Sequence, residues 1–150
     1  MEVRPYLFSD REACLEIYDA SAVELEPTHE RKSFEAFLLK PTSSFFVLEH
    51  ETRLIGCGGF EHSESNPHAQ LIWGMIHANW RRQGLGRYLL MFRLREITRL
   101  NTIQSVQLEV PASLAAFYQH QGFHITAHHQ NAYAPGFDRI ELTKRLTVCP

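Results

Sequence analysis

Apolar positions recur along the chain with two periods, one typical of helices and one typical of strands. Spacings of three and four residues predict helices, as in the stripe of Cys14, Ile17, Tyr18 and Ser21. Alternating or short continuous apolar runs predict strands, and the run at 69–77 is typical of a buried central strand. The predicted strands lie at 3–8, 43–50, 53–62, 69–77, 105–110, 123–130 and 138–146, and the predicted helices at 9–21, around 34–38, and at 85–100 and 113–122. This order suits a mixed sheet with helices on both faces.

The ends of the predicted helices carry local signals of their own. Ser9, followed by Glu12 three residues later, forms a capping-box pattern that predicts the start of the first helix. Ser113 is a candidate N-cap for the last helix, and Gly122 marks its C-terminal end. No repeat, low-complexity tract or linker interrupts the pattern. Residues 1–150 are therefore interpreted as a single domain.

Composition narrows the function classes without choosing one. A chain of 150 residues that is 44% hydrophobic buries a sizeable core, and its formal net charge of −2 gives no overall reason for nucleic acid or an anionic membrane as partner. Cys14, Cys57 and Cys149 are odd in number and scattered, which favours neither a disulfide framework nor a zinc ribbon. The first residues show no signal-peptide core, and no run is long enough to span a bilayer. A cytoplasmic location is expected.

The stretch ANWRRQGLGRYLL, residues 78–90, places two glycines where a helix must begin. Glycine is unfavourable inside helices, so Gly84 and Gly86 require a reason, and close approach of a ligand to the backbone is one. The first N–H groups of a helix lack intrahelical partners and sit at the positive end of its dipole. With Arg81, Arg82 and Arg87 nearby, the stretch predicts an anion site. A tight loop with a solvated basic rim is the alternative.

Two motifs together indicate a family. The segment RRQGLG fits Arg/Gln-x-x-Gly-x-Gly/Ala and resembles the acetyl-CoA-binding signature of the GNAT N-acetyltransferases. The segment LEVPASLAAFYQHQGF, about thirty residues further on, resembles the second signature of that family. The resemblance covers nearly the whole chain. It implies an α/β (α+β mixed) fold with a central mixed, mostly antiparallel sheet of six to seven strands. Helices would cover both faces, and the sheet would splay between its fourth and fifth strands.

The resemblance also assigns the residues that would bind acetyl-CoA. The pyrophosphate would sit on the glycine loop, which matches Arg82, Gln83, Gly84, Leu85, Gly86 and Arg87. The pantetheine amides would pair with the end of the central strand, which matches Gly74, Met75 and Ile76. A dinucleotide-binding loop does not fit, because Leu89 takes the place of the third glycine and seven residues separate Ile76 from Gly84.

Acetyl transfer to an amine requires removal of a proton from the amine and stabilisation of the departing thiolate. Tyr118 matches the tyrosine that acts as general acid in many GNAT enzymes, although a core tyrosine is the alternative. Glu109 points off the apolar face of its strand and resembles the base of the ribosomal-protein N-terminal acetyltransferases. A solvated glutamate is the alternative for Glu109, and Glu61, His62 and His77 are further candidates for the base.

One part of the family pattern is missing. An asparagine that often contacts the cofactor after the fifth strand has no counterpart, and Ser113 is the candidate substitute. The ribosomal-protein substrate is therefore not adopted. Nine histidines raise the question of a metal, but His128 and His129 are adjacent on a strand and point to opposite faces, so no metal is expected.

The acceptor is expected to be a primary amine, on a small molecule or a peptide or protein N-terminus. Glu24 and Glu26, with Glu30, would attract its charge, and Tyr133, with Phe137 and Asp138, would line the other wall. A non-catalytic acyl-CoA sensor is the main alternative, and a phosphate-binding interaction domain for RNA the second. Acyl chain length and oligomeric state stay open, a homodimer included.

Overall fold

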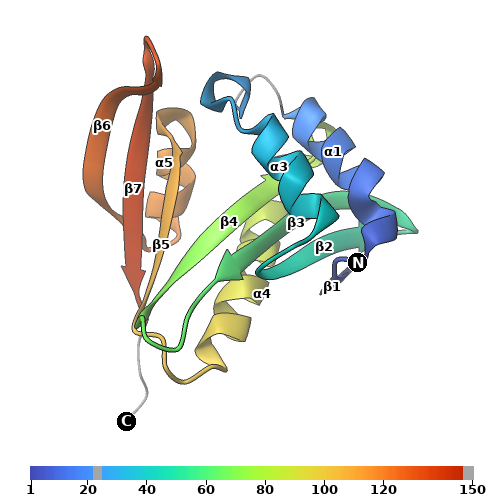
Figure 1. The fold of residues 1–150 in the computed structure, drawn as a ribbon, viewed down its shortest axis with the longest axis horizontal. Helices are drawn as coiled ribbons and strands as arrows, with labels where there is room; N and C mark the ends of the chain where they lie inside the picture. The colour runs from blue at the N-terminus through green and yellow to red at the C-terminus, as the bar shows by residue number, and fades with distance from the viewer. Residues whose placement is uncertain (22–24, 147–150) are drawn as a thin grey trace.

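Seven strands form one sheet in the computed structural model, which describes residues 1–21 and 25–146 (Figure 1). The strand order is β1-β2-β3-β4-β5-β7-β6, and all neighbours are antiparallel except β4 and β5, which are parallel. The strands are β1 Glu2–Pro5, β2 Ser44–His50, β3 Arg53–Glu61, β4 His68–Ile76, β5 Ser105–Pro111, β6 His124–Ala134 and β7 Phe137–Arg145. The predicted mixed, mostly antiparallel sheet is confirmed.

Helices cover both faces of this sheet, as the sequence predicts (Figure 1). The α-helices are α1 Arg11–Ala20, α3 Arg31–Leu39, α4 Leu85–Thr98 and α5 Ala112–His120, and the 3₁₀ turns are η1 Phe8–Asp10, η2 Glu26–Thr28 and η3 Ala78–Trp80. None of the described helices is long and apolar enough to cross a membrane.

The face under α1 and α3 is held by a dense apolar cluster. Cys14 and Ile17 of α1 and Phe34 and Leu38 of α3 are almost completely buried. The Phe34 ring packs against Trp73 of β4, with 4.9 Å between their centroids. Each fully buried side chain of this size contributes about 1.5–3 kcal/mol to folding. This cluster therefore fixes β4 from one side, and the buried stripe of α4 and part of α5 pack on the other.

The sheet opens between its two central strands. The parallel pairing of β4 with β5 is limited to three positions, His68 to Gln70 against Ser105 to Gln107. A bond between the His68 ring Nδ1 and the Ser105 hydroxyl closes this end. Beyond it, the rest of β4 and the rest of β5 diverge, so the predicted splay between the fourth and fifth strands is confirmed (Figure 1).

The two predicted helix caps that involve a serine are wrong. The capping box at Ser9 and Glu12 does not form, because Asp10 instead accepts the Leu7 N–H at 2.8 Å and binds the Arg4 guanidinium, which makes η1 precede α1. Ser113 is not the N-cap of α5, which already begins at Ala112 after the extended Pro111.

The closing hairpin is also longer than predicted. Strand β6 continues to Ala134, so Tyr133 lies on a strand rather than in the connecting loop. The chain reverses at Gly136, whose φ of 81° is easy for glycine. Gly122, in contrast, ends α5 with a φ of 92°, as its position in the sequence predicts.

Candidate functional site

The loop between β4 and α4 ends in a backbone conformation that glycine adopts most easily. Gly84 has a φ of 76° and immediately precedes α4, and no side chain caps the helix there. The first N–H groups of α4, at residues 85–87, have no intrahelical acceptor and lie at the positive end of the helix dipole. The loop therefore presents unsatisfied donors and positive potential, the two properties that bind an anion.

Gly86 differs from Gly84 in this respect. A Cβ atom at this position would lie 3.4 Å from Cζ of Phe117, an ordinary contact distance. Its backbone does not need the left-handed region either, because Gly86 is absent from the residues with positive φ. The fold itself therefore has room for a Cβ atom at 86, so neither packing nor backbone conformation requires glycine there.

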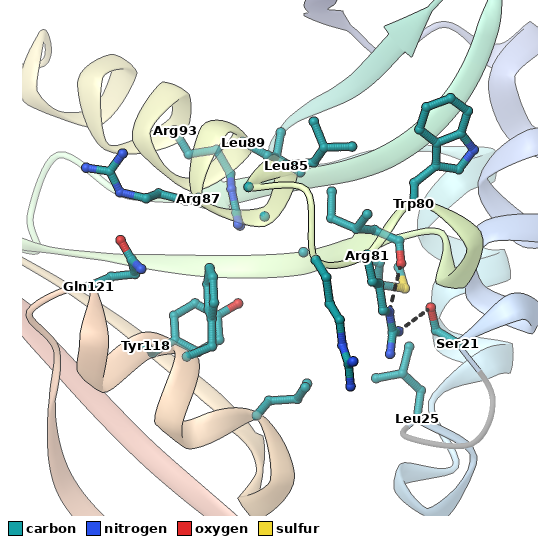
Figure 2. Close-up of a pocket in the computed structure, with 18 residues that line it drawn as sticks. Ser21, Leu25, Trp80, Arg81, Leu85, Arg87, Leu89, Arg93, Tyr118 and Gln121 are labelled. Carbon is teal, nitrogen blue, oxygen red and sulfur yellow. Dashed lines mark hydrogen bonds between the residues drawn. The ribbon is translucent and has the colours of Figure 1, made fainter.

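Three arginines surround this helix start. The Arg81 guanidinium donates to the Ile76 carbonyl through Nε at 3.4 Å and to the Ser21 hydroxyl through Nη2 at 3.1 Å (Figure 2). It thereby ties the loop to the end of α1. Arg82 and Arg87 are exposed and line the same hollow. Their charges are free to meet a ligand, because neither enters an ion pair with a described residue.

A cavity of about 530 Å³, here the large cavity, runs from this loop along β4 to α5 (Figure 2). Its size lies in the range of ordinary small-molecule sites. Its lining is formed by Ser21, Leu25, Gly74, Met75, Ile76, Trp80, Arg81, Arg82, Gly84, Leu85, Gly86, Arg87, Leu89, Arg93, Leu114, Phe117, Tyr118 and Gln121. The lining contains all three predicted strand residues and all predicted loop residues except Gln83.

Strand β4 is irregular where it borders the large cavity. The register against β3 shifts between the pairs Cys57–Met75 and Gly59–Ile72, and Trp73 has a φ of 52°. This bulge interrupts the ladder next to Gly74. On its other side this part of β4 is unpaired, because the pairing with β5 ends at Gln70. The Trp73 carbonyl accepts the Cys57 thiol at 3.7 Å, and the other backbone groups on the unpaired side are available to an extended ligand, in the way an added strand would use them.

Tyr118 lies where the large cavity meets a second, narrow cavity of about 80 Å³. It is 8% exposed, and its ring is held edge-on by Phe117 and Phe123, at centroid distances of 5.0 and 5.7 Å. The narrow cavity opens through the splay toward α3 and β6. The residues that line both cavities, here the seam, are Leu25, Gly74, Met75, Arg93, Leu114 and Tyr118.

Carboxylates gather at the narrow cavity. Glu30 precedes α3 and Glu109 lies on β5, and both line it together with Tyr133 of β6. Partial burial and the nearby Glu109 charge raise the pKa of Glu30. Burial and the same two carboxylates raise the pKa of Tyr133 to about 12. The two carboxylates give the narrow cavity negative charge that suits a cation, although Glu109 also forms an ion pair of 3.9 Å with Nε of Arg139.

Comparison with known proteins agrees with this geometry. The family model of the acetyltransferase (GNAT) family matches residues 11–123. The chain belongs to the GNAT family. The match spans the glycine loop and Tyr118, so both motifs of this GNAT-family chain lie inside it. A sequence comparison with curated proteins finds no match.

Solved structures with the same fold include several acetyltransferases. The ribosomal-protein-S18-alanine N-acetyltransferase from Escherichia coli is 19% identical, with 99% of this chain and 96% of that chain covered and a TM-score of 0.78. The ribosomal-protein-alanine N-acetyltransferase from Brucella melitensis is 21% identical, covering 97% and 100%, with a TM-score of 0.72. An aminoglycoside 6'-N-acetyltransferase complexed with coenzyme A is 12% identical, covering 100% and 99%, with a TM-score of 0.81.

Four further residues that the sequence analysis predicts for the site are Gln83, Ser113, Glu24 and Glu26. Gln83 and Ser113 are exposed and line neither cavity. Glu24 lies outside the described residues, and for Glu26 the structure describes the backbone alone, in η2. Their predicted roles stay predictions. Glu30, a few residues on, is the acid of this segment that the structure brings to the narrow cavity.

The alternative bases are separated from Tyr118. Glu61 and His62 line another cavity, beside the closed end of the β4–β5 pair. His77 is buried, and its Nδ1 accepts the Asn79 N–H at 3.1 Å, on a cavity beneath α1. None of these three lines either of the two cavities that meet at Tyr118. Glu109 is the predicted base that does.

The histidine pair on β6 is accounted for by separate partners. His128 Nε2 bonds Asp138 at 2.6 Å, and His129 Nε2 bonds Glu141 at 2.8 Å. The two rings thus face different carboxylates, as alternation along a strand requires. The described residues contain no cluster of three or more possible metal ligands.

Arg93 is the charged residue of the seam, and the sequence analysis did not single it out. It is 3% exposed, two turns along α4 from Leu85. The signal was present, because Arg93 interrupts the buried apolar stripe of α4 between Leu89 and Ile97. A charged residue at an inward position of an amphipathic helix is rarely fully buried without a function or a partner.

Proposed function

We propose that this GNAT protein transfers acetyl from acetyl-CoA to a primary amine by direct attack in a ternary complex. One observation carries the proposal. Two cavities of opposite character meet at Tyr118, the larger with an anion-binding helix start and the narrower with paired carboxylates. A donor and an acceptor bound in them would have their reacting atoms side by side at the seam, which converts a bimolecular reaction into an effectively unimolecular one.

The donor side suits the pyrophosphate and pantetheine of acetyl-CoA. The unsatisfied N–H groups at residues 85–87 and the charges of Arg82 and Arg87 would hold the pyrophosphate. The unpaired edge at Gly74, Met75 and Ile76 would pair with the pantetheine amides. When bound, acetyl-CoA supplies an acetyl group activated as a thioester.

The residues at the seam divide the proton transfers between them. The Glu109 carboxylate, on the narrow cavity, would take the proton of the incoming amine, directly or through one water. The Tyr118 hydroxyl would donate a proton to the sulfur, a role that a neutral phenol with one O–H can fill. Glu109 and Tyr118 approach the seam from β5 and α5, so one can act on each side of the reacting carbon.

The acceptor side favours a cationic amine. Glu30 and Glu109 would attract an ammonium group, and the Tyr133 ring would cover the adjoining part of the substrate or stack on its charge. A small molecule and a peptide or protein N-terminus both present such a group. The narrow opening favours an unhindered primary amine over a branched or secondary one.

The test has two readouts. First, saturating acetyl-CoA should raise the melting temperature of the purified protein. Second, release of free thiol from acetyl-CoA should be measured against a panel of primary amines and N-terminal peptides, with secondary amines as controls. Absence of a thermal shift would overturn donor binding. A shift without amine-dependent thiol release across the panel would favour the acyl-CoA sensor, which requires only the large cavity.

A further inference from the structure

Arg93 is a buried cation without a carboxylate partner. Its Nη1 donates to the Gly59 carbonyl at 3.3 Å, and its Nε has no hydrogen-bond partner. Among residues 1–21 and 25–146, leaving aside Glu26, of which only the backbone is described, no acidic side chain lies within ion-pair distance of it. A buried charge is ordinarily paired, because taking it out of water costs several kcal/mol. Arg93 departs from that rule at the place where the two cavities meet.

The neighbouring strands are shaped around this side chain. A Cβ atom at Gly74 would lie 2.8 Å from Nη2 of Arg93, and one at Gly58 would lie 3.1 Å from its Cζ. Any larger residue at these two positions would press against the guanidinium. Both glycines therefore give Arg93 room against β3 and β4, and Figure 2 shows the side chain reaching from α4 to β4.

The charged and titratable groups around Arg93 are few. Burial lowers its pKa, and the Tyr118 phenol of α5 and the Cys57 thiol of β3 act in the opposite direction. Cys57 itself is buried next to the thiol of Cys14 on α1. On the narrow cavity, Glu109 and Glu30 lie further out. Arg93 is thus the cation of the seam, with uncharged groups directly against it.

We propose that Arg93 stabilises the coenzyme A thiolate that each acetyl transfer releases. This inference rests on the proposed function. The amine nitrogen forms a bond to the carbonyl carbon, the carbon–sulfur bond breaks, and its electron pair goes to sulfur as a thiolate. The proton leaves the amine for Glu109, and Tyr118 returns one to sulfur. The Arg93 charge lowers the energy of the anion between these events, and in a low-dielectric site such a charge acts strongly.

The free surface of the guanidinium favours a compact anion over a permanent carboxylate. A carboxylate usually pairs with arginine through two parallel N–H groups. Here Nη1 is committed to Gly59, and Nε is inaccessible to a ligand because it is buried. A single sulfur needs only charge and one donor. An acyl chain ending in a carboxylate is therefore the less suitable occupant.

Binding of coenzyme A at different pH values tests the proposal without turnover. The probes are coenzyme A and desulfo-coenzyme A, with affinity followed by calorimetry and thiolate by its ultraviolet absorbance. With the wild type, affinity for coenzyme A should rise with pH as the bound thiol ionises, about one unit below the pKa of the free coenzyme A thiol. Desulfo-coenzyme A should show no such rise. Arg93→Lys should keep the rise in part, and Arg93→Met should abolish it.

Kinetics separate this role from a structural one. Arg93→Met should lower kcat for acetyl transfer by roughly 100-fold and leave KM for acetyl-CoA unchanged. Arg95→Met is the matched control, the same change on the exposed side of α4, and should keep wild-type kcat. Circular dichroism and melting curves establish that each variant folds.

The outcomes distinguish this inference from the proposed function. If neither coenzyme A nor its desulfo form binds the wild type, the proposed function fails. If both bind with the same pH dependence, or if Arg93→Met keeps the thiolate signal, only the role of Arg93 is overturned. A third result is that the wild type strongly prefers succinyl-CoA to the neutral valeryl-CoA and that Arg93→Met loses this preference. That result would overturn the thiolate role of Arg93, because Arg93 would then bind the carboxylate of an acyl chain.

Discussion

The two sides of the seam offer different kinds of chemical group to a ligand. On the large-cavity side, a single loop and helix start supply backbone N–H groups, two glycines and exposed arginines. On the narrow-cavity side, the polar groups are side chains, and each stands on a different element: Glu30 before α3, Glu109 on β5 and Tyr133 on β6. One side depends on backbone geometry at one place, and the other on side chains gathered from three.

This difference has a consequence for specificity. A backbone site survives changes of most side chains, so it suits a ligand that does not change. A side-chain site changes its preference whenever one of its members is replaced, and Glu30 stands on a segment outside the regular elements. Under the proposed function, the preference for an acceptor would therefore be set mainly by the narrow cavity. The expected effects below test this division, beginning with the residue both sides share.

Tyr118→Phe should have the largest effect, because both sides depend on its hydroxyl. The ring contacts with Phe117 and Phe123 remain, so folding and acetyl-CoA binding should be preserved. Turnover should fall by about 10²–10⁴-fold, the usual loss when an acid–base group is removed. Tyr88→Phe, an exposed tyrosine on α4, is the control. Equal rates for Tyr118→Phe and the wild type would make Tyr118 a core residue only.

Gly86→Asp should remove the large-cavity ligand and leave the fold. At about a hundred times its dissociation constant, acetyl-CoA should stabilise the wild type by about 2.7 kcal/mol, measured by thermal denaturation. A carboxylate beside the helix start repels phosphate, so this stabilisation should vanish. Ser65→Asp adds the same charge at an exposed position in the β3–β4 connection and should retain it. A retained shift in Gly86→Asp would place the pyrophosphate elsewhere.

Glu30→Gln should have the smallest effect and should change the kinetics of the amine acceptor alone. Losing one partly exposed charge weakens attraction of an ammonium group by up to about 1 kcal/mol, which is roughly a two- to fivefold rise in KM for the amine. KM for acetyl-CoA should not change. Glu61→Gln, in the cavity at the closed end, is the control. A rise in KM for acetyl-CoA instead would contradict the assignment of the narrow cavity to the acceptor and the large cavity to acetyl-CoA.

The same variant tests the raised pKa of Glu30. Because the pKa of Glu30 is raised in the folded chain, the folded chain holds the carboxyl proton more tightly than the unfolded chain does. Ionisation of Glu30 therefore lowers the free energy of unfolding as pH rises from the ordinary pKa of 4.5 through the raised pKa. Glutamine does not ionise. Glu30→Gln should therefore melt at the wild-type temperature in acid below that range and at a higher temperature at neutral pH. The opposite order at neutral pH would mean that the carboxylate is stabilised by the fold.

The sequence predicted what depends on local pattern. Helix and strand periods located the elements, and Gly84 and Gly86 identified the helix start that borders the large cavity. Tyr118 and Glu109 followed from their motif and face, and the structure brings both to the narrow cavity. The elements and the helix start were predicted correctly because each needed only neighbours in sequence, whereas the catalytic roles of Tyr118 and Glu109 stay predictions.

What the sequence missed depends on pairs of distant segments. The positive φ of Trp73 is invisible in an apolar run that is typical of a regular strand. The burial of Arg93 depends on Gly58 and Gly74 on two other elements. The choice of Glu30 among several acids, and the separation of His77 from Tyr118, follow from how the loops meet in space. The Ser9 cap does not form, because the Asp10 carboxylate accepts the Leu7 N–H and pairs with Arg4 on the preceding strand.

The three-residue pairing between β4 and β5 joins strands β1–β4 to strands β5–β7. Because β4 stays paired with β3, and β5 with β7, a change of the opening angle would turn one part of the sheet against the other. The opening runs along β4 from Gln70 to Ile76, about 20 Å, so a turn of about three degrees would displace its far end by about 1 Å, a displacement that can change a rate about 100-fold. We therefore expect substitutions at His68 or Ser105 to alter turnover without touching a substrate.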